Sequence, residues 1–343
     1  MTDGTGIEWT HRAGTKGETW NPIVGCSIAT AGCINCYAMT MASRIEAIDA
    51  AAARAGHYAG TTKNVKGKPV WTGRIGVAPD HIFTAPLRWR APRTVFVNSM
   101  SDLFHEDVPD AVIDRVFAVM AMSPQHTFQV LTKRSARMRE YMSAHARNGD
   151  FQPMMRIIEA ARAIRPDDLY NMTTWPLPNV WLGVSAERRT EWLERTADLR
   201  KTPAAIRFVS IEPLLGDLGE IDLAGLHWII TGGESGKGAR PMHPDWPGSI
   251  GNQCARAGVA YFHKQNGAFR VVYDRDRDDP DWRRCDAVAA ETPQGRWLNL
   301  AGGHGFHGER LVRVVPTTKK VAGRLLAGVE HNGFPEIREV PFG

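Results

Sequence analysis

The feature that most constrains the fold of this 343-residue chain is a recurring pattern. In each repeat of this pattern, an apolar run ends in polar residues and is followed by a helical or loop segment. Each run is rich in Val, Ile, Phe or Trp, which is typical of strands buried on both faces of a sheet. Six such runs occur, at residues 94–102, 127–134, 179–187, 206–213, 227–235 and 259–267. Helical periodicity falls between or after them, at residues 111–120, 135–146, 189–200 and 246–257. This alternation predicts parallel strands joined by right-handed crossovers.

The number of strand candidates bears on the choice between two α/β folds. A further candidate at residues 19–25 brings the total to about seven, close to the eight strands of a complete (β/α) barrel. We therefore predict an α/β fold of the partial or open TIM-like barrel type, with a doubly wound open sheet as the alternative. The barrel is expected within residues 1–273, with an insertion near residues 45–92. Residues 274–343 are expected to form a C-terminal extension packed on the barrel.

Composition and charge limit the class of protein. Hydrophobic residues make up 43% of the chain, enough for a sizeable core. No run approaches the roughly 18 consecutive apolar residues of a membrane span, and the first residues lack the apolar core of a secretion signal. We therefore expect a cytoplasmic protein with no membrane partner. The formal net charge of +5 favours an anionic partner such as nucleic acid, although it is equally compatible with a basic protein that has no such partner.

Three of the five cysteines, Cys26, Cys33 and Cys36, fall within eleven positions. In a reducing compartment, clustered cysteines more often bind metal or do chemistry than form disulfides. Thiolates are strong ligands for iron and zinc, and Gly25 and Gly32 give the loop the backbone freedom to curl around a metal centre. The loop follows the first predicted strand, which places it at the end of a barrel where the chemistry is normally found.

Three interpretations of these cysteines remain open. An iron–sulfur cluster can be held by three thiolates, with one iron left free for a substrate or cofactor. A structural zinc site would need a fourth protein ligand from a distant residue such as His105, Cys254 or Cys285. The third interpretation is three unrelated buried cysteines. The absence of a nearby fourth ligand in the sequence favours the iron–sulfur cluster.

Ten stretches of the chain carry a family resemblance. They are IEWT (7–10), TWNPIVGC (19–26), GCINCYA (32–38), PLRWRAPRTVFVNSMSDLFHEDVP (86–109), VLTKR (130–134), WLGVSAE (181–187), SIEPLLG (210–216), ITGGESG (230–236), FHKQNG (262–267) and AGRLLAG (322–328). On these motifs the sequence resembles a family of phage and prophage-borne proteins of uncharacterised function that is described by its three-cysteine motif. That family is itself similar to radical SAM enzymes, including the spore photoproduct lyase type.

The resemblance implies a specific chemistry for the cysteines. Cys26, Cys33 and Cys36 would hold a 4Fe-4S cluster, whose fourth iron would be chelated by S-adenosyl-L-methionine. After one-electron reduction by an electron donor, cleavage of this cofactor would give a radical that abstracts hydrogen from a substrate. The cofactor carries that chemistry, and the protein positions it and keeps water out.

Polar residues at the ends of the predicted strands are candidates for binding the cofactor and the substrate. Those expected to bind S-adenosyl-L-methionine are Ser99, Asp102, Ser185, Glu187, Glu212, Gly232, Gly233 and Glu234. Lys133, Arg134 and Lys264 could meet a carboxylate or a phosphate, and the catalytic candidates are Lys133, Lys264 and His105. The alternative is that these charges pair with one another and close the rim of the barrel.

The leading hypothesis is a radical-SAM-like iron–sulfur enzyme that acts on nucleic acid or nucleotides, in phage DNA modification or repair. The alternative is a non-catalytic, metal-stabilised protein for nucleic-acid binding or phage–host interaction. A protein partner encoded by a neighbouring gene is a further expectation.

Overall fold

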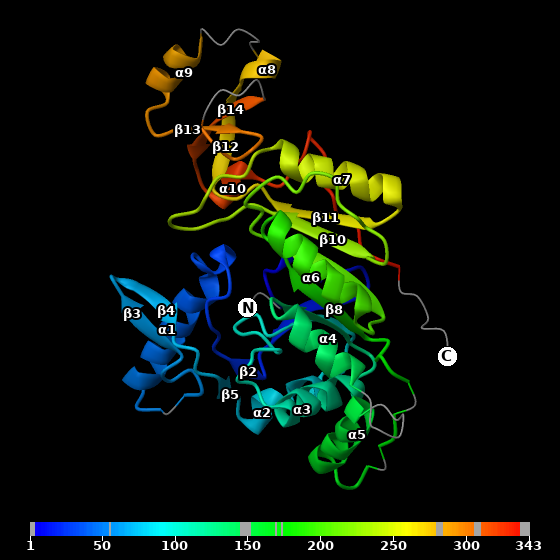
Figure 1. The fold of residues 1–343 in the computed structure, drawn as a ribbon. Coiled ribbons are helices and arrows are strands. Elements are labelled where there is room, and N and C mark those ends of the chain that lie inside the picture. Colours follow the sequence, from blue (N-terminus) through cyan, green and yellow to red (C-terminus); the bar gives the residue numbers. More distant parts are fainter. Residues whose placement is uncertain are drawn as a thin grey trace. The chain divides into compact units, whose positions relative to one another are not determined.

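The computed structural model describes residues 4–54, 56–144, 152–168, 170–172, 174–278, 284–304 and 310–336. Helices and strands are mixed throughout these ranges (Figure 1). The chain divides into two compact units. Unit 1 runs to Val184 and includes Arg195–Phe208, and unit 2 comprises Ser185–Glu194 and Val209–Pro335. Parts of the expected C-terminal extension, residues 279–283, 305–309 and 337–343, lie outside the described residues.

The main sheet contains seven strands in the order β1-β6-β7-β8-β9-β10-β11. Their bounds are β1 (Lys16–Trp20), β6 (Arg93–Val97), β7 (Thr127–Thr132), β8 (Val180–Ser185), β9 (Ile206–Ile211), β10 (Trp228–Gly232) and β11 (Ala260–Gln265). The pairings of β1 with β6, β6 with β7, β7 with β8, and β10 with β11 are all parallel. The predicted mixed α/β class is therefore confirmed. The strand order never reverses as it does in a doubly wound sheet, so it is compatible with a partial or open (β/α) barrel.

The first strand lies earlier in the chain than the predicted residues 19–25. It ends at Trp20, two residues before Pro22, which has no N–H to donate to a ladder. Residues Ile23–Val24 form the short β2, which pairs antiparallel with β5 (Gly76–Val77) in a separate sheet. This change of sheet carries the chain away from β1 just before the cysteines.

The predicted helical intervals correspond to four helices, α3 (Asp110–Ala121), α4 (Ser135–Ser143), α6 (Arg189–Lys201) and α7 (Asp245–Ala257). A further helix, α5 (Gln152–Ile164), contacts α3 within unit 1. At its C-terminus, α7 is stopped by Gly258, whose φ of +65° suits glycine and places its N–H near the last helical carbonyls. None of the helices in the described ranges combines the length and apolar character needed to cross a membrane.

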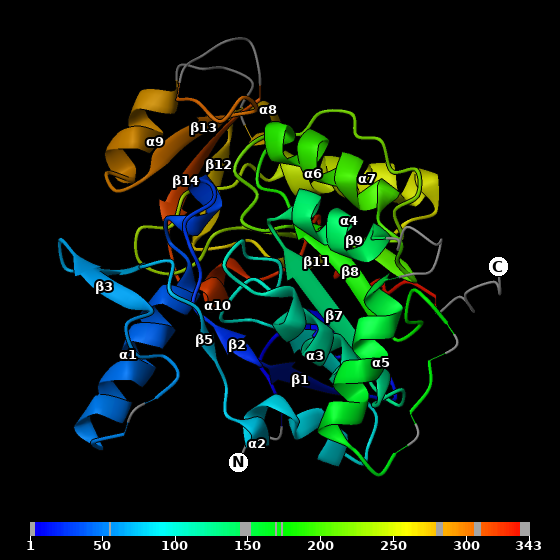
Figure 2. The ribbon, with the colours of Figure 1, turned by 60° about the horizontal axis from the view of Figure 1, so that its bottom comes forward.

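The segment between β2 and β6 builds a small subdomain of unit 1. It contains α1 (Tyr37–Ala51), the hairpin of β3 (Thr62–Val65) and β4 (Lys68–Trp71), α2 (Asp80–Phe83) and the 3-10 helix η3 (Ala85–Arg88). The hairpin turns through Lys66 and Gly67, whose φ angles of +49° and +78° match the two-residue turn that fits the twist of paired strands. In both ribbon views, α1 lies beside this hairpin, with which it makes contacts (Figures 1 and 2).

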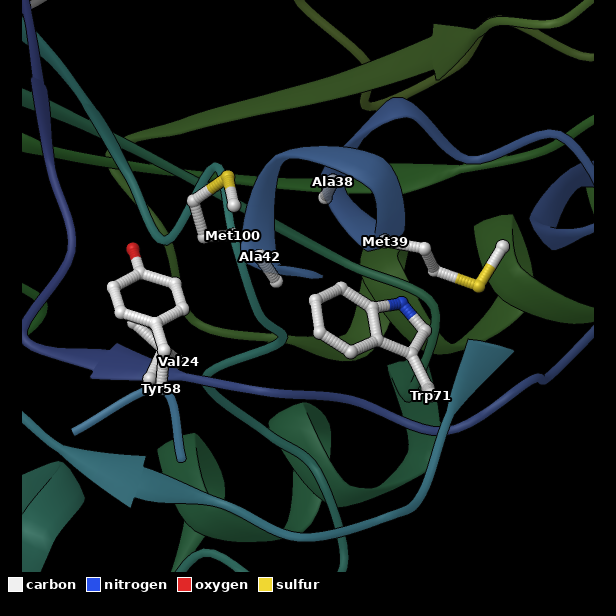
Figure 3. Close-up of a cluster of buried hydrophobic side chains, with 7 residues drawn as sticks. All are labelled: Val24, Ala38, Met39, Ala42, Tyr58, Trp71 and Met100. Atoms are coloured by element: carbon white, nitrogen blue, oxygen red, sulfur yellow. The ribbon is translucent and has the colours of Figure 1, made fainter. Parts of the chain in front are cut away.

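A cluster of buried side chains joins this subdomain to the strands before and after it (Figure 3). Its members are Val24, Ala38, Met39, Ala42, Tyr58, Trp71 and Met100. Cys26 and Cys36 pack against the cluster and are partly buried by it. The apolar core therefore fixes the backbone on which the cysteines stand.

Unit 2 contains a second, antiparallel sheet in the order β12-β14-β13. Its strands are β12 (Phe269–Asp274), β13 (Arg296–Asn299) and β14 (Leu311–Pro316), and the short helices near it are α8 (Arg275–Asp278), α9 (Cys285–Glu291) and α10 (Lys319–Ala322). Phe269, Leu298, Val312 and Val314 from all three strands form one buried cluster with Ala239. The sheet is thus packed on the connection between β10 and α7.

Candidate functional site

The three-cysteine segment, residues 25–37, runs from β2 to the start of α1. Cys26 follows β2, Cys33 ends the 3-10 helix η2 (Ala31–Cys33), and Cys36 is the residue immediately before α1. Gly25 has a φ of +90°, and a Cβ atom added there would lie 2.1 Å from the carbonyl oxygen of Arg74. Only glycine fits this position, which confirms the predicted need for backbone freedom beside the first cysteine.

Ser99 and its neighbour Met100, just after β6, tie both ends of this segment to the sheet. The Ser99 hydroxyl donates to Asn21 Oδ1 at 3.1 Å, and its carbonyl accepts from the Tyr37 hydroxyl at 3.1 Å. The N–H of Gly25 donates to the carbonyl of Met100 at 3.2 Å. Ser99, predicted from its place at a strand end, is therefore part of the frame that holds the three-cysteine segment.

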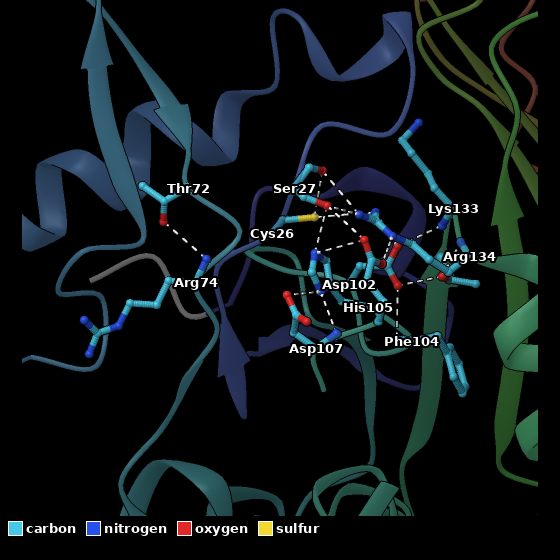
Figure 4. A network of polar contacts seen from close by, with 12 residues as sticks. Cys26, Ser27, Thr72, Arg74, Asp102, Phe104, His105, Asp107, Lys133 and Arg134 are labelled. Atoms are coloured by element: carbon cyan, nitrogen blue, oxygen red, sulfur yellow. Dashed lines mark hydrogen bonds and ion pairs between the residues drawn. The ribbon is translucent and has the colours of Figure 1, made fainter. Parts of the chain in front are cut away.

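Asp102 is the centre of a buried polar network beside Cys26 (Figure 4). Its Oδ1 accepts hydrogen bonds from the Thr132 hydroxyl at 2.6 Å and the Phe104 N–H at 3.1 Å. Its Oδ2 accepts from the Lys133 N–H at 2.9 Å and from Arg134 Nη1 at 3.2 Å. The carboxylate thus joins the carboxyl ends of β6 and β7 and fixes the direction of the Arg134 side chain.

Arg134 links this network to the cysteine loop. Its Nη2 donates to the Ser27 hydroxyl at 2.7 Å, and its Nη1 lies 3.6 Å from Cys26 Sγ. Its Nε donates to Glu106 at 3.3 Å. Burial lowers the pKa of Arg134, but the charges of Asp102, Cys26 and Glu106 outweigh it and raise that pKa above its usual range. Ser27 was not among the predicted residues; its position directly after Cys26 was the only signal for it.

His105 closes the network on the other side of Ser27 (Figure 4). Its Nδ1 accepts the Asp107 N–H at 3.1 Å, so the ring proton belongs on Nε2, which lies 2.8 Å from the Ser27 hydroxyl. Burial lowers the pKa of His105, against the opposing charge of Glu106, and favours the neutral ring. Both ring nitrogens therefore have partners, and His105 supports Ser27.

The three thiols differ in their electrostatic surroundings. Burial, together with the charge of Asp102, raises the pKa of Cys26 to about 12, and burial also raises the pKa of Cys36. Burial acts in the same direction on Cys33, but the charge of Lys133 and nearby hydrogen bonds outweigh it, so the pKa of Cys33 is lowered. Lys133 is itself buried, which lowers its pKa to about 8. Its side chain extends away from the Arg134 network (Figure 4). Cys33 is therefore the thiol best placed to be a thiolate.

Two strand-end carboxylates of unit 2, Glu212 and Glu234, form ion pairs. Glu212 accepts from Lys264 Nζ at 2.9 Å and from Gln265 Nε2 at 2.8 Å. Glu234 accepts from two nitrogens of the Arg240 side chain, at 2.6 and 2.9 Å, and from the Arg240 N–H at 2.8 Å. Arg240 was not among the predicted residues, because it lies six positions beyond Glu234 in a glycine-rich loop whose path the sequence does not reveal.

The remaining unit 2 candidates are held by close packing. A Cβ atom added to Gly233 would lie 2.6 Å from the Asn266 carbonyl oxygen, and one added to Gly232 would lie 3.2 Å from the Glu212 carboxylate. Ser185 and Glu187 are buried, and the Glu187 carbonyl accepts the N–H of Leu215 at 2.9 Å. The predicted set therefore falls into two groups. Ser99, Asp102, His105 and Lys133 belong to unit 1 with the three cysteines, while Ser185, Glu187, Glu212, Gly232, Gly233, Glu234 and Lys264 belong to unit 2.

The donor set of the three-cysteine segment suits a metal centre in its chemistry. All three thiols are free, and Cys33 interacts electrostatically with both Cys26 and Cys36. Across the described ranges, however, no three His, Cys, Asp or Glu side chains are arranged so that they could hold a metal ion. Cys254 and Cys285, considered as fourth ligands, are buried in unit 2. The segment thus supplies soft ligands and nearby cations, although its side chains are not arranged as ligands.

Comparisons with known proteins give one match. Residues 4–335 match the family model described as "Protein of unknown function (DUF5131)". No curated protein and no solved structure matches the chain.

Proposed function

The chain belongs to the DUF5131 family of proteins of unknown function, and we propose that it is a radical-SAM-like iron–sulfur enzyme acting on nucleic acid or nucleotides. Cys26, Cys33 and Cys36 would hold a 4Fe-4S cluster, and S-adenosyl-L-methionine would be the cofactor. Modification or repair of phage DNA is the corresponding process.

The observation that carries this proposal is the pairing of three thiols with two buried or partly buried cations. Lys133 lowers the pKa of Cys33, and Arg134 Nη1 lies 3.6 Å from Cys26 Sγ. Thiolates are the form that binds iron, and a cluster held by them brings negative charge to the site. Lys133 and Arg134 would offset that charge in a partly desolvated environment, where electrostatic interactions are stronger than in water.

The chain's own residues would hold the cysteine loop and its charges in place. Asp102 orients Arg134 through Oδ2, and Arg134 in turn holds Ser27 next to Cys26. His105 supports the same hydroxyl from the other side. When bound, the cluster would supply the electron for reductive cleavage of S-adenosyl-L-methionine, so an external electron donor is part of the proposal.

The cofactor-binding role of Ser99, Asp102, Ser185, Glu187, Glu212, Gly232, Gly233 and Glu234 stays within the proposal. Glu212 and Glu234 already hold the cations of Lys264 and Arg240, so they are oriented acceptors for an ammonium or a ribose hydroxyl. Among the catalytic candidates Lys133, Lys264 and His105, Lys133 is the one whose charge acts on a proposed cluster ligand.

The metal is tested first, by reconstituting the protein with iron and sulfide under anaerobic conditions. We expect a brown protein with about four irons per chain. Alanine at position 26, 33 or 36 should abolish this, whereas Cys254→Ala, a buried cysteine outside the segment, should retain it. A wild-type protein that binds no iron would end the proposal. Zinc in place of iron, with salt-dependent DNA binding, would favour the alternative of a non-catalytic nucleic-acid-binding or phage–host interaction protein.

The reaction is tested next on the reconstituted protein. Reduction with dithionite in the presence of S-adenosyl-L-methionine should yield 5′-deoxyadenosine, and the Cys33→Ala variant should yield none. A bound cluster that gives no such product after reduction would exclude the radical chemistry and leave only the metal site.

A further inference from the structure

The positive charge of the chain is concentrated in one segment of unit 1. Residues 37–78 hold six Lys or Arg and two acidic residues, whereas the whole chain holds 42 and 37. This segment, which contains α1 and the β3–β4 hairpin, therefore accounts for most of the formal net charge of +5. A concentration of one sign of charge creates a local potential that attracts a partner of the opposite sign.

The two acidic side chains of this segment are already used inside it. Glu46 accepts hydrogen bonds from the Gly60 N–H at 2.6 Å and from the Thr62 hydroxyl at 3.2 Å. Asp49 pairs with Arg54 at 3.0 Å. The side chains of the remaining cations are exposed and form no ion pair or hydrogen bond within the described ranges; they are Arg44, Lys63, Lys66, Lys68 and Arg74.

The hairpin carries lysines at both of its edges and in its turn. Lys63 lies in β3, Lys68 lies in β4 and Lys66 lies between them, and residues 63–68 are all exposed. In both ribbon views this end of the hairpin projects at the edge of unit 1 (Figures 1 and 2). The major groove of B-DNA admits a two-stranded ribbon, and lysines on its two edges would then face the two phosphate backbones.

A purely structural role explains only part of this charge. Charged residues, lysine above all, protect the edges of an exposed sheet from pairing with another chain. Edge protection does not require that every charge of the hairpin be positive. It also does not account for Arg44 and Arg74, which lie outside the two strands. An anionic partner accounts for both observations.

The base of the hairpin is joined to the three-cysteine segment. The N–H of Gly73, two residues after β4, donates to the Cys26 carbonyl at 3.2 Å. The Arg74 carbonyl fills the space beside Gly25, and the Arg74 side chain extends away from the Asp102 network (Figure 4). A polyanion that contacts both the hairpin and Arg74 is therefore held next to the first cysteine.

We propose that the β3–β4 hairpin, with Arg44 and Arg74 beside it, is the docking surface for duplex DNA. Its contacts are made with the phosphate backbone, so they fix the position of the DNA and do not read its sequence. The inference deepens the proposed function by naming the substrate class and the residues that hold it. It rests on that function for the reaction, whereas the binding itself needs no cluster.

The test is fluorescence anisotropy of a short labelled DNA duplex, titrated with the full-length, cluster-free protein at several salt concentrations. The triple variant Lys63→Gln, Lys66→Gln and Lys68→Gln should bind at least about tenfold more weakly, and the slope of log affinity against log salt should become shallower by about three. Arg74→Gln alone should make that slope shallower by about one.

The matched control removes the same charge from exposed lysines elsewhere, through Lys201→Gln, Lys237→Gln and Lys320→Gln. This control should bind within about twofold of the wild type and keep its salt slope. All the changed side chains are exposed, so the Tm of each variant should match that of the wild type and show that it is folded.

Several outcomes would overturn the docking surface. They are a wild-type protein that does not bind the duplex, and a hairpin variant that binds as tightly as the control variant. Tighter binding of single-stranded DNA, of RNA or of acidic phospholipid vesicles through the same lysines would assign the surface to that partner instead of duplex DNA.

These results are independent of iron, so the two proposals fail separately. A reconstituted cluster in a protein that binds no DNA would leave free nucleotides as the substrate of the proposed enzyme. DNA binding by a protein that forms no cluster would leave the docking surface and remove the radical chemistry.

Discussion

The strand ends of unit 1 and unit 2 carry similar residue types but arrange them differently. In unit 2 two strand-end carboxylates are paired with cations, Glu212 with Lys264 and Glu234 with Arg240. In unit 1 the carboxylate Asp102 is used mainly to bind the backbone and to direct Arg134, and the second cation, Lys133, acts on the thiol of Cys33. Polar residues at the ends of strands can thus either neutralise one another or prepare a reactive group.

The difference lies in what balances each positive charge. A carboxylate that accepts from a lysine or arginine is held in one orientation by the ion pair. A thiol near a lysine changes its protonation equilibrium, because the cation favours the thiolate. The unit 1 arrangement therefore alters chemistry, while the unit 2 arrangement alters mainly geometry. Three changes test this contrast, and they are ordered by expected effect.

The largest effect is expected for Asp102→Asn. The new NH2 group would face the Lys133 N–H and Arg134 Nη1, which now donate to Oδ2. Leaving a largely buried guanidinium without this partner should lower the free energy of unfolding by about 3–5 kcal/mol, measured by urea denaturation. The matched control is Asp198→Asn, because the partners of the Asp198 carboxylate in the described part of the chain are the side chains of Ser135 and Arg139 and no backbone N–H. An equal loss in the two variants would show that Asp102 has no special role.

The second effect is the loss of stability at acidic pH that comes from buried histidines. Burial lowers the pKa of His263 in unit 2 to about 4, whereas an unfolded histidine titrates near its ordinary value of about 6.5. The unfolded chain therefore binds more protons between these values. The contribution of His263 to the free energy of unfolding should therefore be complete above about pH 6.5, and the free energy of unfolding should fall by roughly 2–3 kcal/mol as the pH drops towards 4.

His263→Gln should remove most of this slope, which is measured by urea denaturation at several pH values. The same change at His105 extends the comparison to unit 1. Burial also lowers the pKa of His105, but Glu106, Asp102 and Asp107 oppose that shift, so His105→Gln should change the slope less. If His105→Gln changed the pH dependence of the unfolding free energy more than His263→Gln does, the acid sensitivity would come from unit 1, against this prediction.

The smallest effects are expected when the two ion pairs of unit 2 are broken one at a time. Arg240→Ala removes both side-chain nitrogens that donate to the buried Glu234 carboxylate, and should cost about 2 kcal/mol of unfolding free energy. Lys264→Ala leaves Glu212 with Gln265 in a more exposed place, and should cost about 1 kcal/mol or less. Thermal unfolding of both variants against wild type gives the comparison. The reverse order would mean that the two-pronged contact of Arg240 contributes little.

Much of the fold follows from local properties of the sequence. The runs that became β6 to β11 are rich in Val, Ile, Leu, Phe and Trp, the composition expected of strands buried on both faces. The first strand was misplaced because its pairing ends before Pro22, and the following residues, Ile23–Val24, pair with β5 instead. The position of β5, far along the chain, is not visible in the local sequence. The antiparallel sheet of β12, β13 and β14 was not predicted, since β12 pairs with β14 rather than with β13, the next strand along the chain.

The site was predictable in its residue types and less so in its contacts. Cysteine spacing and strand-end positions led to Cys26, Ser99, Asp102 and Lys133, because these depend on the chain's order. The roles of Ser27 and Arg240 depend on how loops fold back, which short-range patterns do not encode.

Gly25 has a consequence for recognising more distant proteins of this kind. The Arg74 carbonyl oxygen occupies the space where any other residue at position 25 would carry its first side-chain carbon. A sequence with three suitably spaced cysteines but a bulkier residue at this point could not follow the same path into its first thiol. A single small residue is therefore a sharper criterion for homology searching and loop redesign than the cysteines alone.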